Sequence, residues 1–319
     1  MNGKAGAVDD PLLESWLRRY PRIAPLADTY VAYSTPDAAT WPSVVEPSPM
    51  DDCVRCSVHA AAIMRRCLAI ARWPAAGGTW AGESSGASPR RTDTLAALEA
   101  EAWGAFLAAF LTVESSDRLG RGETDGQARA LLHMAAPVVA LANARQAVAI
   151  TAAAIEASGE AVLSGEATLE GLLREALGLA RRAGGLRALE LDTLLPSELH
   201  AGLAALMGRA SACLRGLTEP RLVAASRVAV GALERATLWL ESGKDHEVLQ
   251  AGAARLAVTF ARGLELALLC EHAQWMMDHG GDRRGFAAAL RFSRLPVDQV
   301  HEVDLELDRA LLAPTGGRG

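Results

Sequence analysis

The chain has 319 residues, of which 50% are hydrophobic and 22% are charged, and its mean hydropathy is +0.12. This composition excludes a mini-protein or a disordered chain and predicts one large folded domain or two modest ones. The formal net charge of −6 argues against nucleic acid and anionic membrane surfaces as partners, because no global basic field is present to neutralise phosphates.

Residues 1–50 are predicted to be a Pro-rich arm or linker, because prolines interrupt them too often for more than a short helix. From Asp51 onward, apolar residues recur at three- and four-residue spacing, which is typical of helices, and strand patterns are absent. Long helices with short connections predict an all-α antiparallel bundle. The expected helices are 51–73, 92–116, 124–158, 166–182, 196–215, 220–242, 245–279, 283–293 and 297–312.

Two of the expected helix boundaries have a clear physical cause. Gly280 and Gly281 can adopt the left-handed conformation that ends a helix, and Asp282 can cap the helix that follows. Pro220 stands where the first turn of a helix tolerates proline.

The sequence predicts a cytoplasmic protein that does not cross a membrane. The longest apolar stretch, 135–157, carries Asn143, Arg145 and Gln146, which a membrane span of about 20 apolar residues would not contain. No secretory signal pattern is visible near the N-terminus. Five cysteines without a framework spacing predict reduced thiols.

Cys53, Cys56 and His59 form a Cys-x-x-Cys-x-x-His sequence whose side chains are good zinc ligands. A closed structural zinc site needs four ligands, and residues three apart drift around a continuous helix. No second pair with matching spacing is present in the sequence. Packing of small side chains on a helix is therefore the favoured interpretation, and no metal site is predicted.

Cys270, Glu271 and His272, followed by Asp278 and His279, contain the residue types of a Cys/His nucleophile pair. Neighbouring residues on a helix point in different directions. The favoured interpretation is therefore that these side chains serve packing and the charge at the helix end.

A series of residues between Leu132 and Asp192 carries a family resemblance. They are Ala136-Pro137, Arg145, Ala147-Val148, Glu156, Gly159, Arg174-Glu175-Ala176 and Leu191-Asp192. Aligned without a gap, this segment resembles the C-terminal helical domain of acyl-CoA dehydrogenases, particularly the branch that includes DNA-alkylation-response proteins. The resemblance implies that 51–195 form the family's helical bundle and that 196–319 form a helical extension packed on it.

The same alignment departs from the family at its cofactor and base positions. Glu160, Val162 and Leu163 stand where the family has two glycines and a tyrosine, so the close backbone approach to the flavin pyrophosphate is lost. Ala183 stands where many members have the glutamate that removes the substrate α-proton, and alanine cannot act as a base. The Pro-rich arm stands where the family has the helical part and β-barrel that hold flavin and acyl-CoA.

The resemblance therefore implies the scaffold of the family without a self-sufficient FAD-dependent activity. No cofactor is expected on the isolated chain, and FAD is expected only at an interface with a full-length partner. The candidate catalytic residues are Glu160, Glu166 and Arg174. The vestigial cofactor-binding positions are Arg145, Gly159, Arg174 and Gly184.

Three functions remain open from the sequence. The favoured one is a pseudoenzyme that assembles, as a homo- or hetero-oligomer, with a full-length acyl-CoA dehydrogenase-type flavoprotein. The alternative is a re-purposed flavin-independent enzyme that acts on a small molecule or a carrier-bound acyl group in a biosynthetic pathway. The third is nucleic-acid association through the Arg-rich segment from Arg283 to Arg294, which the net negative charge disfavours.

Overall fold

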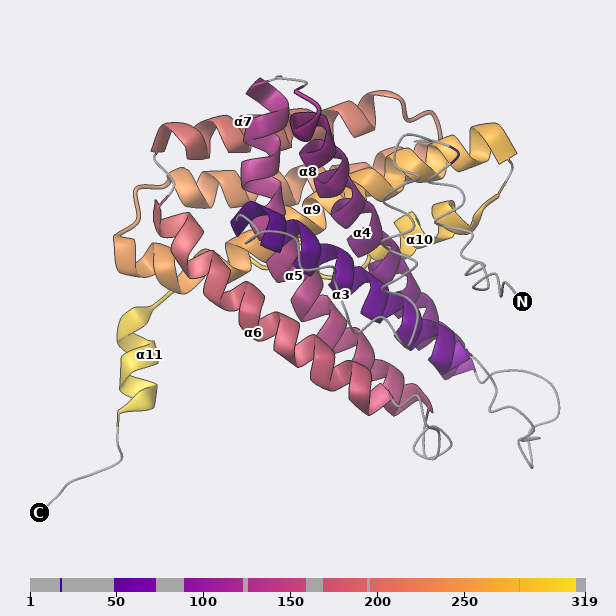
Figure 1. Cartoon of the computed structure of the whole chain (residues 1–319), viewed down its shortest axis with the longest axis horizontal. Coiled ribbons are helices and arrows are strands. Elements are labelled where there is room, and N and C mark those ends of the chain that lie inside the picture. The colour runs from indigo at the N-terminus through magenta and orange to yellow at the C-terminus, as the bar shows by residue number, and fades with distance from the viewer. Residues whose placement is uncertain are drawn as a thin grey trace, which may run out of the picture.

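The computed structural model describes residues 49–72, 89–122, 126–158, 169–193, 196–280 and 282–313, together with Arg18. Nearly all of the expected Pro-rich arm lies outside these residues. Within them the chain forms nine helices and no strand, which confirms the predicted all-α class (Figure 1). The helices are α3 (Pro49–Arg72), α4 (Pro89–Gly120), α5 (Gly126–Ser158), α6 (Leu169–Thr193), α7 (Pro196–Arg215), α8 (Pro220–Glu241), α9 (His246–Gly280), α10 (Arg284–Phe292) and α11 (Leu305–Leu312).

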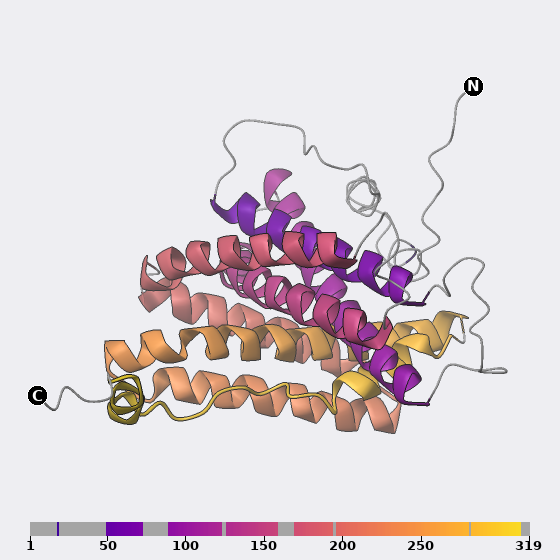
Figure 2. The same ribbon diagram turned by 90° about the horizontal axis from the view of Figure 1, so that it is seen from below.

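Helix α5 is the centre of the bundle and packs against α3, α4, α6, α7 and α9. In the view of Figure 2, α3 and α6 lie on one face of the molecule, α8 and α9 lie on the other, and α5 runs between them. Helix α9 is the second hub, because it also contacts α4, α7, α8 and α10. The two hub helices therefore join the first half of the described chain to the second.

The sequence of α5 explains its central position, because it is apolar around its whole circumference and such a helix must be buried. Small alanine side chains on α5 and its neighbours allow the helices to pack closely. Asn143 is one of the buried polar side chains of α5, and its Nδ2 donates hydrogen bonds to the backbone carbonyls of Ser57 on α3 (3.2 Å) and Ala105 on α4 (3.0 Å). This amide therefore connects three helices in the core.

Two glycines set how closely α9 approaches α8. A Cβ atom on Gly252 would lie 2.2 Å from Cη2 of Trp239, and a Cβ on Gly263 would lie 2.7 Å from the side chain of Leu233. Both distances are shorter than real carbon contacts, so glycine at these two positions is required for the observed packing.

Most predicted helices agree with the observed ones within a few residues, but two differ at one end. The sequence pattern predicts an end at residue 182 for α6, whereas the helix continues to Thr193, through Gly184 and Gly185. The pattern also predicts a single helix from 297 to 312, but residues 297–304 are not helical. Pro220 begins α8 as predicted. The N-cap of α10 is Arg283 instead of the predicted Asp282, although Oδ1 of Asp282 accepts a hydrogen bond from the backbone N–H of Arg284 (2.8 Å).

The segment 297–304 is held extended by contacts with α8 and α9. Thr259 accepts a hydrogen bond on Oγ1 from the backbone N–H of Gln299 (2.9 Å), and Asp298 forms an ion pair with Arg235 (2.6 Å). Asp304 then caps α11 by accepting from two backbone N–H groups of its first turn. These tertiary contacts override the helical spacing of the sequence, and a helix starts only where a cap is available.

Among the described residues, two helices are long and apolar enough to cross a membrane by length and composition, namely α4 and the segment Gly126–Ala157 of α5. In their most apolar windows, 78% and 67% of the residues are buried inside the bundle. A helix buried by its own protein is a normal core helix, so these two carry little weight as membrane spans.

Candidate functional site

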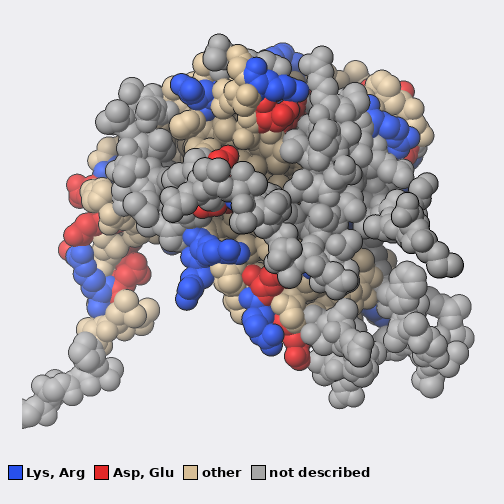
Figure 3. Space-filling model, in the orientation of Figure 1, with Lys and Arg blue, Asp and Glu red and all other residues tan. Residues whose placement is uncertain are grey.

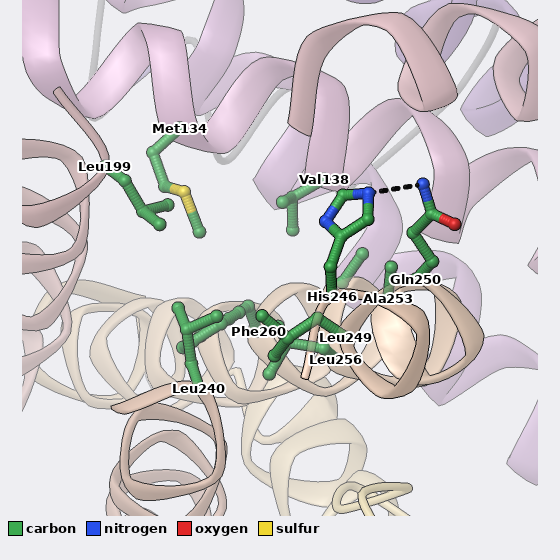
Figure 4. Close-up of a pocket in the computed structure, with 11 residues that line it drawn as sticks. Met134, Val138, Leu199, Leu240, His246, Leu249, Gln250, Ala253, Leu256 and Phe260 are labelled. Atoms are coloured by element: carbon green, nitrogen blue, oxygen red, sulfur yellow. Dashed lines mark hydrogen bonds between the residues drawn. The ribbon is translucent and has the colours of Figure 1, made fainter. Parts of the chain in front are cut away.

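An apolar pocket of about 190 Å³ lies where the two halves of the described chain meet. Four helices enclose it: α5, α7, α8 and α9 (Figure 4). Its lining residues are Met134, Val138, Leu199, Leu240, His246, Leu249, Gln250, Ala253, Leu256, Ala257 and Phe260.

The α9 side of the pocket follows directly from helix periodicity. Its lining residues are spaced three or four apart from His246 to Phe260, so they share one face of the helix. On the opposite side, Gly202 of α7 allows close approach to α5, because a Cβ there would lie 2.8 Å from Cβ of Met134. Ala253 adds only a methyl group to the wall, which leaves space that a larger side chain would fill.

The polar groups of the pocket are His246 and Gln250, both exposed, one helical turn apart on α9. The two Nε2 atoms are 2.9 Å apart and form a hydrogen bond, drawn as a dashed line in Figure 4. An amide nitrogen can only donate, so Nε2 of the imidazole is the acceptor in this hydrogen bond. The pocket therefore combines an apolar interior with one hydrogen-bonding pair at its edge.

The charged groups next to His246 in the chain are mainly acidic or already paired. Asp245 and Glu247 flank His246 at the positive end of the α9 dipole, which they complement. Glu247 forms an ion pair with Arg309 of α11 (2.7 Å), and Lys244 forms one with Glu302 (2.7 Å). The neighbouring cations thus have carboxylate partners within the chain.

A second polar group lies deeper, at the contact of α9 with α4 and α5. Gln146 donates from Nε2 to Oε2 of Glu265 (2.9 Å), and Arg262 donates from Nη1 to Oε2 of Glu101 (3.0 Å). The guanidinium of Arg262 also lies over the ring of Phe292, 4.9 Å from its centroid. Oε1 of Glu265 is buried without a hydrogen-bond partner among the described residues.

Burial raises the pKa of Glu265 to about 8, although Arg262 and the hydrogen bond from Gln146 act in the opposite direction. The side chain is fully buried, so the ionised carboxylate would lose its hydration without full compensation. Glu265 is therefore mostly protonated at neutral pH. This cluster joins the two halves of the described chain and is not part of the pocket lining.

The predicted family positions that lie among the described residues do not line the pocket. Arg145 on α5 and Arg174 on α6 are exposed, and Gly184 is half-buried on α6. Gly159, Glu160 and Glu166 lie outside the described residues, so their roles stay predictions.

Ala183, the residue at the family's base position, is 2% exposed and packs in the core. It offers the bundle a buried methyl group. The described family positions thus supply exposed guanidinium groups and an apolar contact.

The Cys53, Cys56 and His59 sequence does not form a metal site among the described residues, where no group of three or more His, Cys, Asp or Glu side chains is placed to hold an ion. Burial raises the pKa of the Cys56 thiol to about 11. His59 instead binds Glu175 of α6, and this hydrogen bond is the main cause that lowers the pKa of Glu175. The sequence at the start of α3 therefore serves packing and a link to α6.

The second cysteine and histidine group also serves packing, in agreement with the favoured interpretation of its sequence. Cys270 is fully buried, and burial raises the pKa of its thiol to about 12. His272 stacks on Trp275, with ring centroids 5.8 Å apart. Glu271 forms an ion pair with Arg209 of α7 (3.0 Å). Glu271 and His272 contact different neighbours and the Cys270 thiol is buried, so these groups do not act together as a nucleophile pair.

Sequence reasoning missed both the pocket and the buried Glu265. The lining of α9 looks like an ordinary core face, and nothing in its spacing reveals that four helices leave a space there. Glu265 had a detectable signal, because it is an acidic residue inside the long apolar run from Leu256 to Cys270. A charge inside such a run is rarely buried without a specific partner.

Comparison with known proteins places this geometry in a known fold. No protein-family model matches the sequence, and no curated protein matches it. Among solved structures, the crystal structure of Caenorhabditis elegans ACDH-11 in complex with C11-CoA superposes on 83% of this chain with a TM-score of 0.71 and 20% sequence identity. The chain has the acyl-CoA dehydrogenase helical fold.

The acyl-CoA dehydrogenase-like fold predicted from the Leu132 to Asp192 segment is thereby confirmed. At 20% identity the likeness concerns the fold alone. This chain covers 47% of the ACDH-11 chain, about half of its length. The helical scaffold is shared, and the activity and ligands of the larger protein are not transferred by the superposition.

Proposed function

We propose that this chain is a non-catalytic assembly subunit with the acyl-CoA dehydrogenase helical fold, whose partner is a full-length acyl-CoA dehydrogenase-type flavoprotein. FAD, where present, is held by that partner and at the shared interface. Ala183 supports the non-catalytic part of this proposal, since a buried methyl group takes the place of the family's base.

Helix α11 is the observation that carries the assembly role. It has eight residues, none of which is buried, and it extends from one end of the bundle (Figure 1). Leu307, Leu311 and Leu312 are 68%, 84% and 81% exposed. An isolated helix this short is marginal in water, and packing of an apolar face normally stabilises it. A partner that covers these leucines supplies that packing.

The surface charge is consistent with a protein partner. On the face of the molecule in Figure 3, acidic and basic side chains of the described residues are interspersed, without an extended basic field. Interspersed charges favour protein contacts over a phosphate backbone. The exclusion of nucleic acid remains a prediction, and absence of salt-dependent DNA binding at low ionic strength would support it.

Native mass spectrometry of the protein drawn from its own cell extract tests the assembly role, because it reports subunit identity, stoichiometry and bound cofactor together. We expect a complex with a larger FAD-carrying subunit. A flavin-free monomer or a homo-oligomer would contradict the proposal.

Two variants make the test specific for α11. Leu307→Asp with Leu311→Asp is expected to abolish the complex by placing charges on the contact face. Leu238→Asp is the matched control, because Leu238 is 66% exposed on α8 and its replacement should leave the complex intact. Equal loss of the complex in both variants would argue against α11 as the contact.

The pocket favours a second candidate, a flavin-independent enzyme that acts on a small molecule or a carrier-bound acyl group. Its support is the imidazole of His246 at the edge of an apolar cavity. Under this alternative His246 is the group that moves a proton. His246→Asn tests it, since turnover of a true substrate should fall by two orders of magnitude or more, about the size of a lost general base.

A further inference from the structure

The pocket between α5, α7, α8 and α9 has a size, a wall and an edge that together define a ligand class. Its volume of about 190 Å³ is of the same order as an engineered apolar cavity of about 150 Å³ that binds benzene. A ligand of roughly six to eight non-hydrogen atoms therefore fits inside. A longer chain would have to leave the pocket at its edge.

The wall accepts apolar atoms only. Val138, Leu256, Ala257 and Phe260 are buried and present aliphatic or aromatic carbon to the space, as Figure 4 shows for the three larger side chains. A charged group placed among them would lose its hydration without a partner. The buried end of the ligand is therefore a hydrocarbon.

The edge accepts one polar head group without net negative charge. His246 and Gln250 can donate and accept hydrogen bonds, so they can bind a hydroxyl or an amide. Glu247 is paired with Arg309 and Lys244 is paired with Glu302, so neither pair carries a net charge. Asp245, which directly precedes His246, adds one negative charge and repels an anion.

We propose that this pocket binds a small uncharged molecule, consisting of a short hydrocarbon chain or ring with one hydrogen-bonding head group such as an alcohol or amide. It discriminates against carboxylates and acyl-CoA thioesters of the same chain length. The basis is a pocket of suitable volume, a hydrocarbon wall and an acidic edge. Binding of this ligand does not depend on assembly with a flavoprotein, so it goes beyond the proposed assembly role.

Isothermal titration calorimetry of the full chain with hexan-1-ol, hexanoate and hexanoyl-CoA tests the proposal, because the three share one chain and differ in the charge of the head group. We expect saturable binding of hexan-1-ol at one site and at least tenfold weaker binding of the two anions. Hexanoate or hexanoyl-CoA binding as tightly as hexan-1-ol would overturn the proposal, as would the absence of saturable hexan-1-ol binding.

A pair of variants on α9 locates the site. Ala253→Phe fills the pocket and should reduce hexan-1-ol binding at least tenfold. Ala251→Phe adds the same ring at an exposed position outside the pocket and should leave binding within twofold. Persistence of binding in a folded Ala253→Phe protein would show that the ligand sits elsewhere.

Variants at the exposed edge keep the test informative if Ala253→Phe does not fold. Gln250→Leu should weaken hexan-1-ol binding roughly three- to tenfold, the effect of one lost hydrogen bond, and leave benzene binding unchanged. Asp245→Asn should bring hexanoate within threefold of hexan-1-ol. An unchanged preference for hexan-1-ol in this variant would overturn the charge argument.

Discussion

The amide of Gln146 on α5 donates a hydrogen bond of 2.9 Å to Oε2 of Glu265 on α9, and both side chains are buried. This contact joins the two hub helices of the bundle in their interior. Hydrogen bonds in such an environment are strong, and a buried polar atom left without a partner is costly. The pair therefore controls both the stability of the bundle and its dependence on pH.

The stability of the protein should decrease as the pH rises from about 5 to about 8. The pKa of Glu265 is about 8 in the folded state and near 4.5 when exposed, so the folded state binds more protons in this window. Unfolding in this window therefore releases a proton, and the free energy of unfolding decreases by at most about 1.4 kcal/mol per pH unit as the pH rises. Below about pH 4.5 the carboxyl is protonated in both states and this contribution is flat.

Urea unfolding at several pH values measures this slope. Glu265→Gln should remove it, because the amide does not titrate, whereas Glu234→Gln at an exposed position of α8 should retain it. A slope that is the same in both variants would assign the pH dependence to other groups.

Replacement of Gln146 by Leu should destabilise the protein by about 1–3 kcal/mol. The change leaves the carboxyl of Glu265 without its donor in the core, and an unsatisfied buried polar group costs about this much. Combining it with Glu265→Met should recover most of the loss, because two apolar side chains replace both partners. Chemical denaturation of the two variants gives the comparison, and an equally unstable double variant would show that packing rather than the hydrogen bond dominates.

Alanine substitutions at two glycines should change the stability of the protein in opposite directions. Gly252→Ala is expected to destabilise the protein by about 1–3 kcal/mol, since its Cβ would lie 2.2 Å from Trp239. Gly208 on α7 is exposed, and a methyl group placed there would have nothing within 4 Å, so Gly208→Ala should stabilise by about 0.5–1 kcal/mol. Thermal melting of both variants tests the sign of each effect.

The thiols should be unreactive in the folded protein. All five cysteines are buried, and burial raises the pKa of Cys56 and Cys67 to about 11 and that of Cys270 to about 12. Reaction with a chromogenic disulfide requires an accessible thiolate. At pH 8 we expect less than one thiol to react within minutes in native buffer and all five in denaturant. Rapid modification of the native protein would place at least one thiol at the surface.

The sequence determined the helices and the fold class. Three- and four-residue apolar spacing located most helix bounds, and Pro220 marked the start of α8, because helix starts and periodicity are local properties. The ungapped family matches between Leu132 and Asp192 also pointed to the correct scaffold. By contrast, local spacing misplaced the end of α6 and the start of α11, and the start of α11 depends on contacts of residues 297–304 with distant segments.

Only the tertiary structure revealed the pocket and the buried Glu265 cluster. The pocket exists because four helices that are distant in sequence, from Met134 on α5 to Phe260 on α9, meet around small side chains such as Ala253. The altered pKa of Glu265 arises from the loss of water around it, which is set by every helix packed against α9. Periodicity shows which face of a helix is apolar. The space that remains between packed helices, and the exclusion of water from it, depend on how the whole bundle is packed.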